Sequence, residues 1–307
     1  MPKKSSDGVW GKRKKYKISL TTATAIEIEE LLSQKFLGGF PVILSSGRGA
    51  IKLIVQEFWT EKDISVFQYA SQCVVEAIQA AGVTPFSSTN FTSQIVYNQW
   101  GQLDLACQTA PFMEDSCDTF LPEGSSVLRL GAQFEIWSLP KILESRFGAV
   151  VWCRESENAI NLRGIRDLPK GGTFRKQILR NFRKISKWNY KIWEASEFKT
   201  FKLSKYEYAS ILQDVSKWSE SYYARRELKR KAYIFLCESY PQYFGSPIDF
   251  GDIIQNPAGP VVYLDPKNSN PGDFLPSKAF QVLHKIASGK RPQKVLLYKF
   301  LHDGCLK

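Results

Sequence analysis

Short apolar runs alternate with amphipathic segments between residues 40 and 155. The first run, Val42 to Leu44, leads into a turn of small residues at positions 45–49 and then into apolar residues at helical spacing. This order predicts a strand, a turn and a helix. Strands that alternate with helices along a chain are typical of a parallel sheet that is covered by helices. The pattern therefore predicts an α/β fold.

The same alternation continues downstream. Residues 63–69 predict a strand, residues 71–82 predict a helix that Gly82 closes, and residues 83–88 predict another strand. Four further apolar runs predict strands at residues 93–101, 111–116, 133–138 and 148–153. Upstream of the sheet, Thr24 stands at the N-cap position of a helix.

The second half of the chain has a different pattern. Residues 203–240 predict a long helix with breaks, and residues 257–268 predict a strand bounded by prolines. We therefore expect a large domain over residues 1–195, with its core at 40–155, and a small C-terminal α/β domain over residues 196–307.

The composition excludes several kinds of site. The two histidines, His284 and His302, lie near the C-terminus, and none of the six cysteines forms a CxxC pair. We expect no metal site and no His-centred triad, so Lys, Cys, Ser, Asp or Glu must supply any covalent chemistry. Scattered cysteines are typical of a cytoplasmic protein, and no apolar run approaches the ~20 residues that span a bilayer. We expect a cytoplasmic location without membrane association.

The net charge of +12 invites a nucleic-acid interpretation, because a basic surface releases counterions from a phosphate backbone. The charge is concentrated in Lys12–Lys17, Arg175–Lys187 and Arg225–Lys231. A solvated face or a funnel for an anionic substrate explains such runs as well. Because these runs lie outside the segments that carry the chemical motifs, we do not expect nucleic acid as the partner.

The turn after the first strand could bind a phosphate group. A phosphate needs backbone N–H donors at the positive end of a helix and small residues that allow a close approach. Ser45 to Ala50, with the sequence SSGRGA, has these properties. An ordinary strand-to-helix turn would have the same sequence features, so this alternative stays open.

Two charged residues follow later strands. Asp115 follows an apolar run, which places it at the carboxyl end of a strand, where open α/β sheets bind ligands. Lys141 follows the run at residues 133–137 and precedes the run at 148–151. Asp115 could instead be a turn or capping residue.

These segments, in this order, resemble the DegT/DnrJ/StrS nucleotide-sugar aminotransferases, a family of fold-type I pyridoxal phosphate (PLP) enzymes. The resemblance implies an aspartate-aminotransferase-like large domain with a mostly parallel mixed sheet flanked by helices. It implies that Lys141 is the catalytic residue and holds pyridoxal 5'-phosphate as a Schiff base. With this role we expect neighbouring positive charge to lower the pKa of Lys141. The other cofactor-binding residues that it implies are Ser46, Gly47, Arg48 and Ser138 at the phosphate, Asp115 at the pyridine nitrogen and Tyr69 on the ring face.

The resemblance also implies a function and an assembly. The enzyme would transfer an amino group from an amino acid to a keto-sugar nucleotide, and it would work as a homodimer with a shared site. The aromatic content of 13% suits an interface, where aromatic residues are enriched. The alternative is a catalytically degenerate member that keeps the fold and binds a ligand or partner without turnover, because the chain is shorter than usual members.

Overall fold

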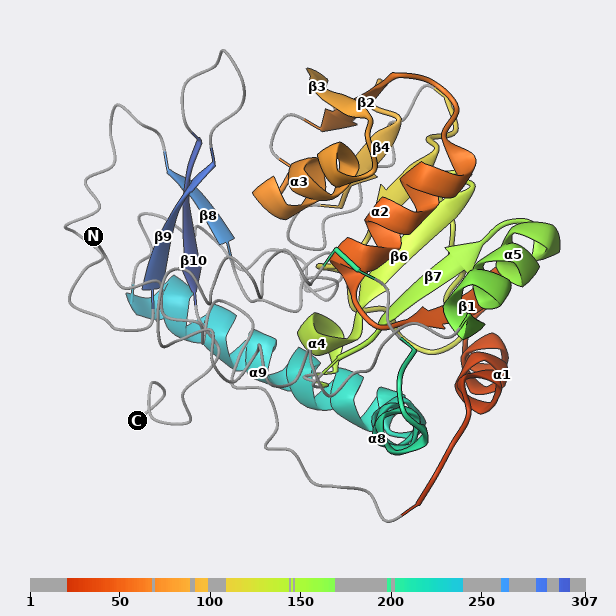
Figure 1. The fold of residues 1–307 in the computed structure, drawn as a ribbon. Helices are drawn as coiled ribbons and strands as arrows, with labels where there is room; N and C mark the ends of the chain where they lie inside the picture. The colour runs from red at the N-terminus through yellow and green to blue at the C-terminus, as the bar shows by residue number, and fades with distance from the viewer. Residues whose placement is uncertain are drawn as a thin grey trace, which may run out of the picture.

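The computed structural model describes residues 21–67, 70–88, 92–98, 109–143, 145, 147–168, 198–199, 202–239, 261–264, 280–285 and 293–298. A seven-stranded sheet lies between two layers of helices (Figure 1). This arrangement agrees with the α/β fold that the alternating pattern predicts.

The strands of the large sheet fall within the predicted apolar runs, except that β1 begins at Phe40, two residues before the predicted start at Val42. They are β1 (Phe40–Leu44), β2 (Asp63–Phe67), β3 (Thr84–Ser88), β4 (Ile95–Tyr97), β5 (Met113–Asp115), β6 (Phe134–Ser138) and β7 (Ala149–Cys153). Their order is β1-β7-β6-β5-β4-β2-β3. The pairs from β3 to β6 are parallel, whereas β7 is antiparallel to both β6 and β1. The sheet is therefore mixed and mostly parallel, as predicted.

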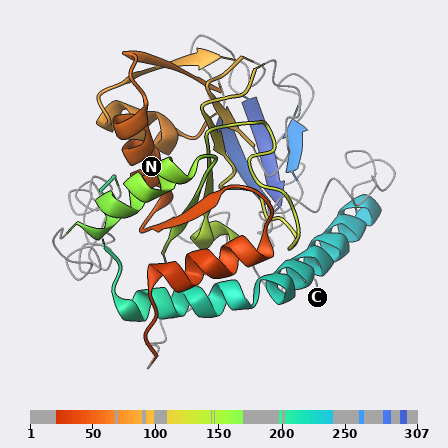
Figure 2. The same cartoon turned by 90° about the vertical axis from the view of Figure 1, so that its right-hand side faces the viewer.

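Helices cover both faces of this sheet. They are α1 (Ala25–Lys35), α2 (Gly47–Phe58), α3 (Gln72–Ala80), α4 (Leu139–Ile142), α5 (Ser156–Asp167), α8 (Lys205–Ser216) and α9 (Trp218–Ser239). One layer contains α2, α3 and α5, and the other contains α1, α8 and the first turns of α9. Figure 2 shows α1 lying along α8, with α9 continuing beyond them.

Local signals account for several helix ends. Thr24 caps α1 as predicted: its Oγ1 accepts from the Glu27 N–H, and the Glu27 carboxylate accepts from the Thr24 N–H at 2.6 Å. This reciprocal capping satisfies two donors that the helix leaves unpaired. Gly82 follows α3 with a φ of +87°, a conformation that a residue with a Cβ adopts only with strain.

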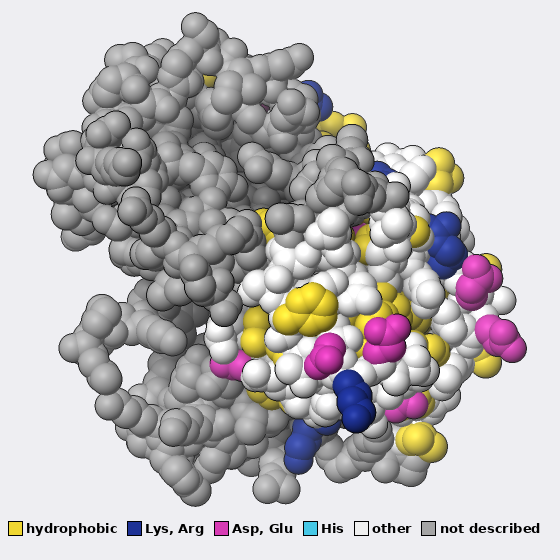
Figure 3. Space-filling model, turned by 90° about the horizontal axis from the view of Figure 1, so that it is seen from above, with side chains coloured by type: hydrophobic (Ala, Val, Ile, Leu, Met, Phe, Trp, Pro, Cys, Tyr) yellow, Lys and Arg dark blue, Asp and Glu magenta, His cyan; other side chains and the backbone are white. Residues whose placement is uncertain are grey.

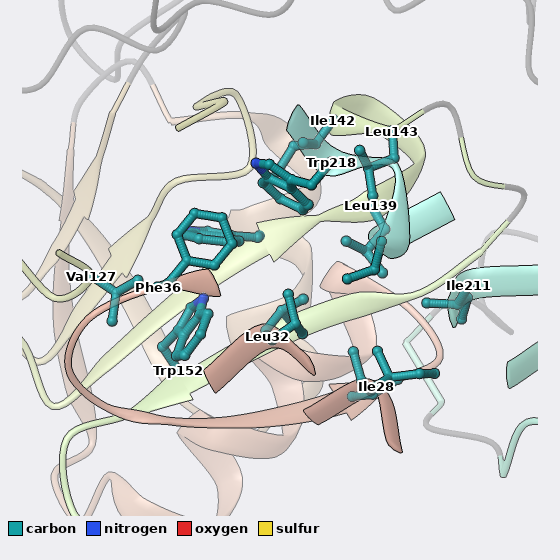
Figure 4. Packing of buried hydrophobic residues seen from close by; sticks show 14 of the residues in the cluster. Ile28, Leu32, Phe36, Val127, Leu139, Ile142, Leu143, Trp152, Ile211 and Trp218 are labelled. Carbon is teal, nitrogen blue, oxygen red and sulfur yellow. The ribbon is translucent and has the colours of Figure 1, made fainter. Parts of the chain in front are cut away.

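An aromatic cluster joins the second helix layer to the sheet. The Phe36 ring contacts Trp137 and Trp218 with centroids 4.9 Å apart, and it contacts Trp152 at 5.9 Å (Figure 4). Because Trp218 begins α9, the first turn of that helix is part of this core. The predicted domain division after residue 195 stays a prediction, and α8 and the start of α9 pack on the large sheet.

A second sheet lies in the C-terminal region. It contains β8 (Val261–Leu264), β9 (Phe280–Lys285) and β10 (Gln293–Tyr298), in the antiparallel order β8-β10-β9. The first of these strands is the one predicted between prolines. No helix within the described residues is long and apolar enough to cross a membrane.

Candidate functional site

The carboxyl ends of the parallel strands meet at one edge of the large sheet. Asp115 ends β5 in register with Tyr97 at the end of β4 and with Ile136 of β6. Residues 116–120, which follow β5, are all buried. Polar groups in this segment therefore face other protein groups and not bulk solvent. The edge is where an open α/β sheet positions a ligand.

The predicted phosphate turn is the N-terminus of α2. Ser46 is the N-cap, and its Oγ accepts from the Gly49 N–H at 3.2 Å. Gly47 and Arg48 begin the first turn of α2, the positive end of the helix. A Cβ placed on Gly47 would lie 3.6 Å from Cys117 Sγ, so this turn contacts the segment after Asp115.

Asp115 is buried, with 3% of its surface exposed. Its Oδ1 accepts from the Cys117 N–H at 3.1 Å. Burial raises the pKa of the Asp115 carboxyl, Lys141 opposes this effect, and the net shift is upward. A buried carboxylate of this kind favours a positively charged partner, because burial without one is costly.

Lys141 lies in α4, directly after β6. Its Nζ donates to Asp118 Oδ1 at 2.7 Å in an ion pair. The Asp118 side chain is fully buried, whereas 26% of the Lys141 side chain is exposed. The second oxygen of Asp118, Oδ2, accepts from the Tyr97 hydroxyl. Asp118, in the loop that follows β5 (residues 116–120, the β5 loop), therefore binds the amine, and Tyr97 of β4 fixes the Asp118 carboxylate.

The expectation of a lowered pKa for Lys141 is wrong. Burial acts to lower the pKa of the amine, but Asp118, Cys117 and Asp115 act to raise it, and the net shift is upward. The surroundings carry negative charge instead of the positive charge that was expected. Lys141 is consequently an ammonium ion at neutral pH in this structure.

Backbone hydrogen bonds join the phosphate turn to the lysine helix. The Gly148 N–H donates to the Ser45 carbonyl at 3.1 Å, and the Leu139 N–H donates to the Gly148 carbonyl at 3.2 Å. Ser138 is the half-buried N-cap of α4. The two segments, far apart in sequence, are thus fixed relative to each other through Gly148.

Most of the predicted site residues come together. Gly47, between Ser46 and Arg48, lies beside Cys117 in the segment after β5, and Asp115 and Lys141 lie in the same charge cluster. Tyr69, predicted on the ring face, lies outside the described residues. The roles of all these residues stay predictions.

The sequence interpretation missed Asp118, Tyr97 and Arg225. Asp118 follows Asp115 by three positions in a mostly polar segment, and Tyr97 ends an apolar run. A buried acid or a strand-end tyrosine is a weak signal alone. Arg225 was assigned to a basic run, but its guanidinium donates to the Lys141 carbonyl at 3.1 Å.

The residues present fit pyridoxal phosphate. This cofactor needs an amine for attachment, a buried carboxylate for its ring nitrogen and an anion site for its phosphate. Lys141, Asp115 and the N-terminus of α2 supply these three. Within the described residues, the buried Asn98 Oδ1 beside this edge lacks a hydrogen-bond partner. Asn98 is fixed by its own N–H, which donates to the Asp115 carbonyl at 3.0 Å. Such an orphaned acceptor leaves capacity for a ligand donor.

Comparison with known proteins gives a family match and structural neighbours. A family model described as "Putative PLP-dependent aminotransferase" matches residues 32–248. A search of curated proteins found no match. A DegT DnrJ EryC1 StrS aminotransferase from Brucella abortus is 12% identical, with a TM-score of 0.57 over 89% of this chain and 84% of that chain. PseC from Helicobacter pylori, an aminotransferase involved in the biosynthesis of pseudoaminic acid, is also 12% identical, with a TM-score of 0.59 over 90% and 85%.

DesI, solved in the presence of its TDP-sugar product, is 12% identical, with a TM-score of 0.58 over 90% of this chain and 79% of that chain. At this identity the three structures show a shared fold. They confirm the predicted aspartate-aminotransferase-like architecture of this chain.

Proposed function

Because this chain belongs to the family of PLP-dependent aminotransferases that matches it, we propose that it transfers an amino group from an amino acid to a keto-sugar nucleotide, with Lys141 attaching the cofactor. The enzyme class and the cofactor follow from the family. The convergence of three features at one sheet edge supports the assignment of residues. These features are the Lys141 amine, the buried Asp115 carboxylate and the N-terminus of α2.

Bound PLP supplies a protonated ring that accepts electrons from the carbon that loses a proton. Asp115 would hold the positive charge at the ring nitrogen, since a nearby carboxylate favours the charged form of a base. Ser46, Gly47 and Arg48 would bind the phosphate with backbone and hydroxyl donors, with Ser138 as a further hydroxyl. Lys141 would hold or move a proton at Nζ.

A sugar nucleotide suits this chain as the amino acceptor. Two of the structural neighbours are PseC, involved in the biosynthesis of pseudoaminic acid, and DesI, solved in the presence of its TDP-sugar product. The net charge of +12 favours a substrate that carries a diphosphate. Figure 3 shows acidic and basic side chains interspersed on one face, which does not favour a nucleic-acid surface there.

One observation favours a second function, binding without turnover. Lys141 is held as an ammonium ion by Asp118, and an ammonium ion is not a nucleophile. A degenerate member would keep this ion pair when ligand is added. An active member would release the amine when PLP enters.

We also propose a homodimer whose partner completes the site, and a ring-stacking role for Tyr69. Light scattering across dilution measures the assembly. A protein that stays monomeric at micromolar concentration with cofactor bound would contradict the shared site.

Cofactor absorbance and peptide mapping test the function. The protein with PLP should absorb near the visible edge, and borohydride should then fix the cofactor to the peptide that contains Lys141. Lys141→Ala should abolish both signals, whereas Lys35→Ala, at another paired lysine, should leave them unchanged. Label on another lysine would overturn the site. If PLP binds at Lys141 but glutamate and other amino acids fail to convert it to its amine form, the protein is the degenerate member.

A further inference from the structure

Asp118 is a fully buried carboxylate that contacts the amine of Lys141. Both of its oxygens are used: Oδ1 accepts from Lys141 Nζ at 2.7 Å, and Oδ2 accepts from the Tyr97 hydroxyl. A buried carboxylate is stable as an ion only with such partners. The charge on Asp118 and the charge on Lys141 therefore depend on each other.

Other titratable groups around the amine do not replace Asp118. Besides Asp118, the groups that affect the pKa of Lys141 are Asp115 at the end of β5, Cys117 just after it and Cys73 from α3, while Arg225 of α9 contacts the lysine backbone. Asp115 and Cys117 have raised pKa values because they are buried. Asp118 acts on Lys141 more strongly than these groups, and it makes the direct hydrogen bond. It is thus the principal acceptor for the lysine's proton.

We propose that Asp118 is the positioning residue of Lys141, holding the lysine as an ammonium ion in the cofactor-free protein and accepting one proton from Nζ when the amine reacts. In this step one Nζ–H bond breaks and one Oδ1–H bond forms, so a charged pair becomes a neutral pair. The Tyr97 hydroxyl keeps Oδ2 in place. The ion pair between Asp118 and the free lysine does not depend on the proposed function. The transfer of the proton during cofactor attachment does depend on it.

Acetylation of the cofactor-free protein tests the hold on the lysine. Only the neutral amine reacts, so brief pulses of an acetylating reagent from pH 7 to 10.5, with peptide mass spectrometry, report the fraction of each lysine that is neutral. In the wild type, Lys141 should react at least ~10-fold more slowly at pH 8 than the exposed Lys62, since one pKa unit is tenfold. Equal rates would overturn the proposal without any variant.

Asp118→Asn removes the charge and keeps the shape; its amide oxygen can still accept one hydrogen bond, while its amide nitrogen can only donate. Acetylation of Lys141 should then rise at least ~10-fold at pH 8, with its pH profile moved by about one unit or more to lower pH, and Lys62 should not change. Asp118→Glu, which keeps the charge, should keep the acetylation of Lys141 slow. A structural role alone would change the unfolding temperature but not this profile, so an unmoved profile in the folded Asn variant would refute the proposal.

Glu123→Gln is the matched control. It breaks the Lys35–Glu123 ion pair, in which Nζ and Oε1 are 2.6 Å apart, close to the 2.7 Å between Lys141 Nζ and Asp118 Oδ1. The Glu123 side chain, however, is 31% exposed. An exposed pair contributes little, so acetylation of Lys35 should change less than ~5-fold. Lys141 should be unaffected. A change at Lys35 as large as that at Lys141 in Asp118→Asn would show that burial of Asp118 has no special effect.

Cofactor attachment gives a second measurement. We expect the pH profile of the rate at which PLP absorbance appears to move to lower pH in Asp118→Asn. The shift should equal that of the acetylation profile. If PLP never binds to the wild type while acetylation behaves as expected, the proposed function fails and the hold on Lys141 stands. If PLP binds but both profiles stay unmoved, the function stands and the role of Asp118 fails.

Discussion

Arg225 Nη1 donates to the carbonyl oxygen of Lys141 at 3.1 Å, which joins α9 to the helix that carries the predicted cofactor lysine. The same guanidinium lies 5.8 Å from the centre of the Phe120 ring. Phe120 in turn packs edge-on against Trp218 at the start of α9. A residue of the basic run thus contacts the backbone of the helix that carries Lys141.

Arg225→Ala should weaken both the fold and cofactor binding. The loss of a charged hydrogen bond and a cation–π contact is expected to cost ~1–3 kcal/mol. Thermal unfolding and PLP titration by absorbance measure the two effects. Arg226→Ala, at the exposed neighbouring position, should change neither. Equal effects of the two variants would mean that the contact with Lys141 contributes nothing.

Gly148→Ala should destabilise the junction between β7 and α4. Gly148 has a φ of +104°, and an added Cβ would lie 3.1 Å from side-chain atoms of Leu139 and Ile211. Strain and crowding together should lower the free energy of unfolding by ~2–4 kcal/mol. Denaturant unfolding measures the change.

Gly82→Ala separates strain from crowding. Gly82 also has a positive φ of +87°, but an added Cβ there would meet nothing within 4 Å. Its cost should be limited to the ~1–2 kcal/mol of a left-handed residue. If Gly148→Ala costs no more than Gly82→Ala, the contacts with Leu139 and Ile211 adjust freely.

The large sheet was predictable because its signals are local. Each apolar run is short, each helix keeps its apolar spacing, and Thr24 and Gly82 mark ends through chemistry that involves only nearby residues. The direction of β7 was not predictable in this way. An antiparallel strand depends on how the chain returns to the sheet, and an apolar run such as residues 148–153 has the same pattern in either direction.

The charge state of Lys141 was not predictable for a different reason. It depends on Asp118 and Tyr97, which approach the amine only because β4, β5 and β6 are neighbours in the sheet. Asp118 is visible in the sequence as an acid near Asp115, but nothing local indicates which of the two faces Lys141. The order of strands decides the pairing, and with it the sign of the pKa shift.

Asp115→Asn should separate cofactor binding from chemistry if the proposed function holds. A neutral amide no longer favours a protonated ring nitrogen, so PLP should still attach to Lys141 while conversion by glutamate falls ~100-fold or more. Stopped-flow absorbance follows this half-reaction. Asp63→Asn, at the exposed start of β2, is the control and should react normally. A normal rate in Asp115→Asn would remove that residue from the site.

Two glutamates face each other on the buried sheet surface away from Asp115. Glu114 and Glu135 are in register on β5 and β6, and both are 0% exposed. Glu114 Oε1 accepts from the Leu130 N–H at 3.1 Å, and Glu135 accepts from the Trp137 Nε1–H at 2.7 Å. Burial, followed by the charge of Glu135, raises the pKa of Glu114 to about 8. Glu114 is therefore protonated in the folded protein over a pH range in which it is ionised when unfolded.

The stability of the protein should consequently fall as the pH rises from about 4.5 to about 8. The folded state holds the Glu114 proton more tightly than the unfolded state, in which the pKa of this carboxyl is near 4.5. The stabilisation from this proton is therefore complete at low pH and is lost as the pH rises through about 8. Glu114→Gln keeps an acceptor for Leu130 and cannot ionise. Its unfolding temperature should therefore decline less between pH 6 and 9 than that of the wild type, by at least ~3 °C if one pKa unit of linkage is removed. Glu57→Gln, at an exposed position of α2, should keep the wild-type decline. Parallel curves for Glu114→Gln and the wild type would show that Glu114 does not hold this proton.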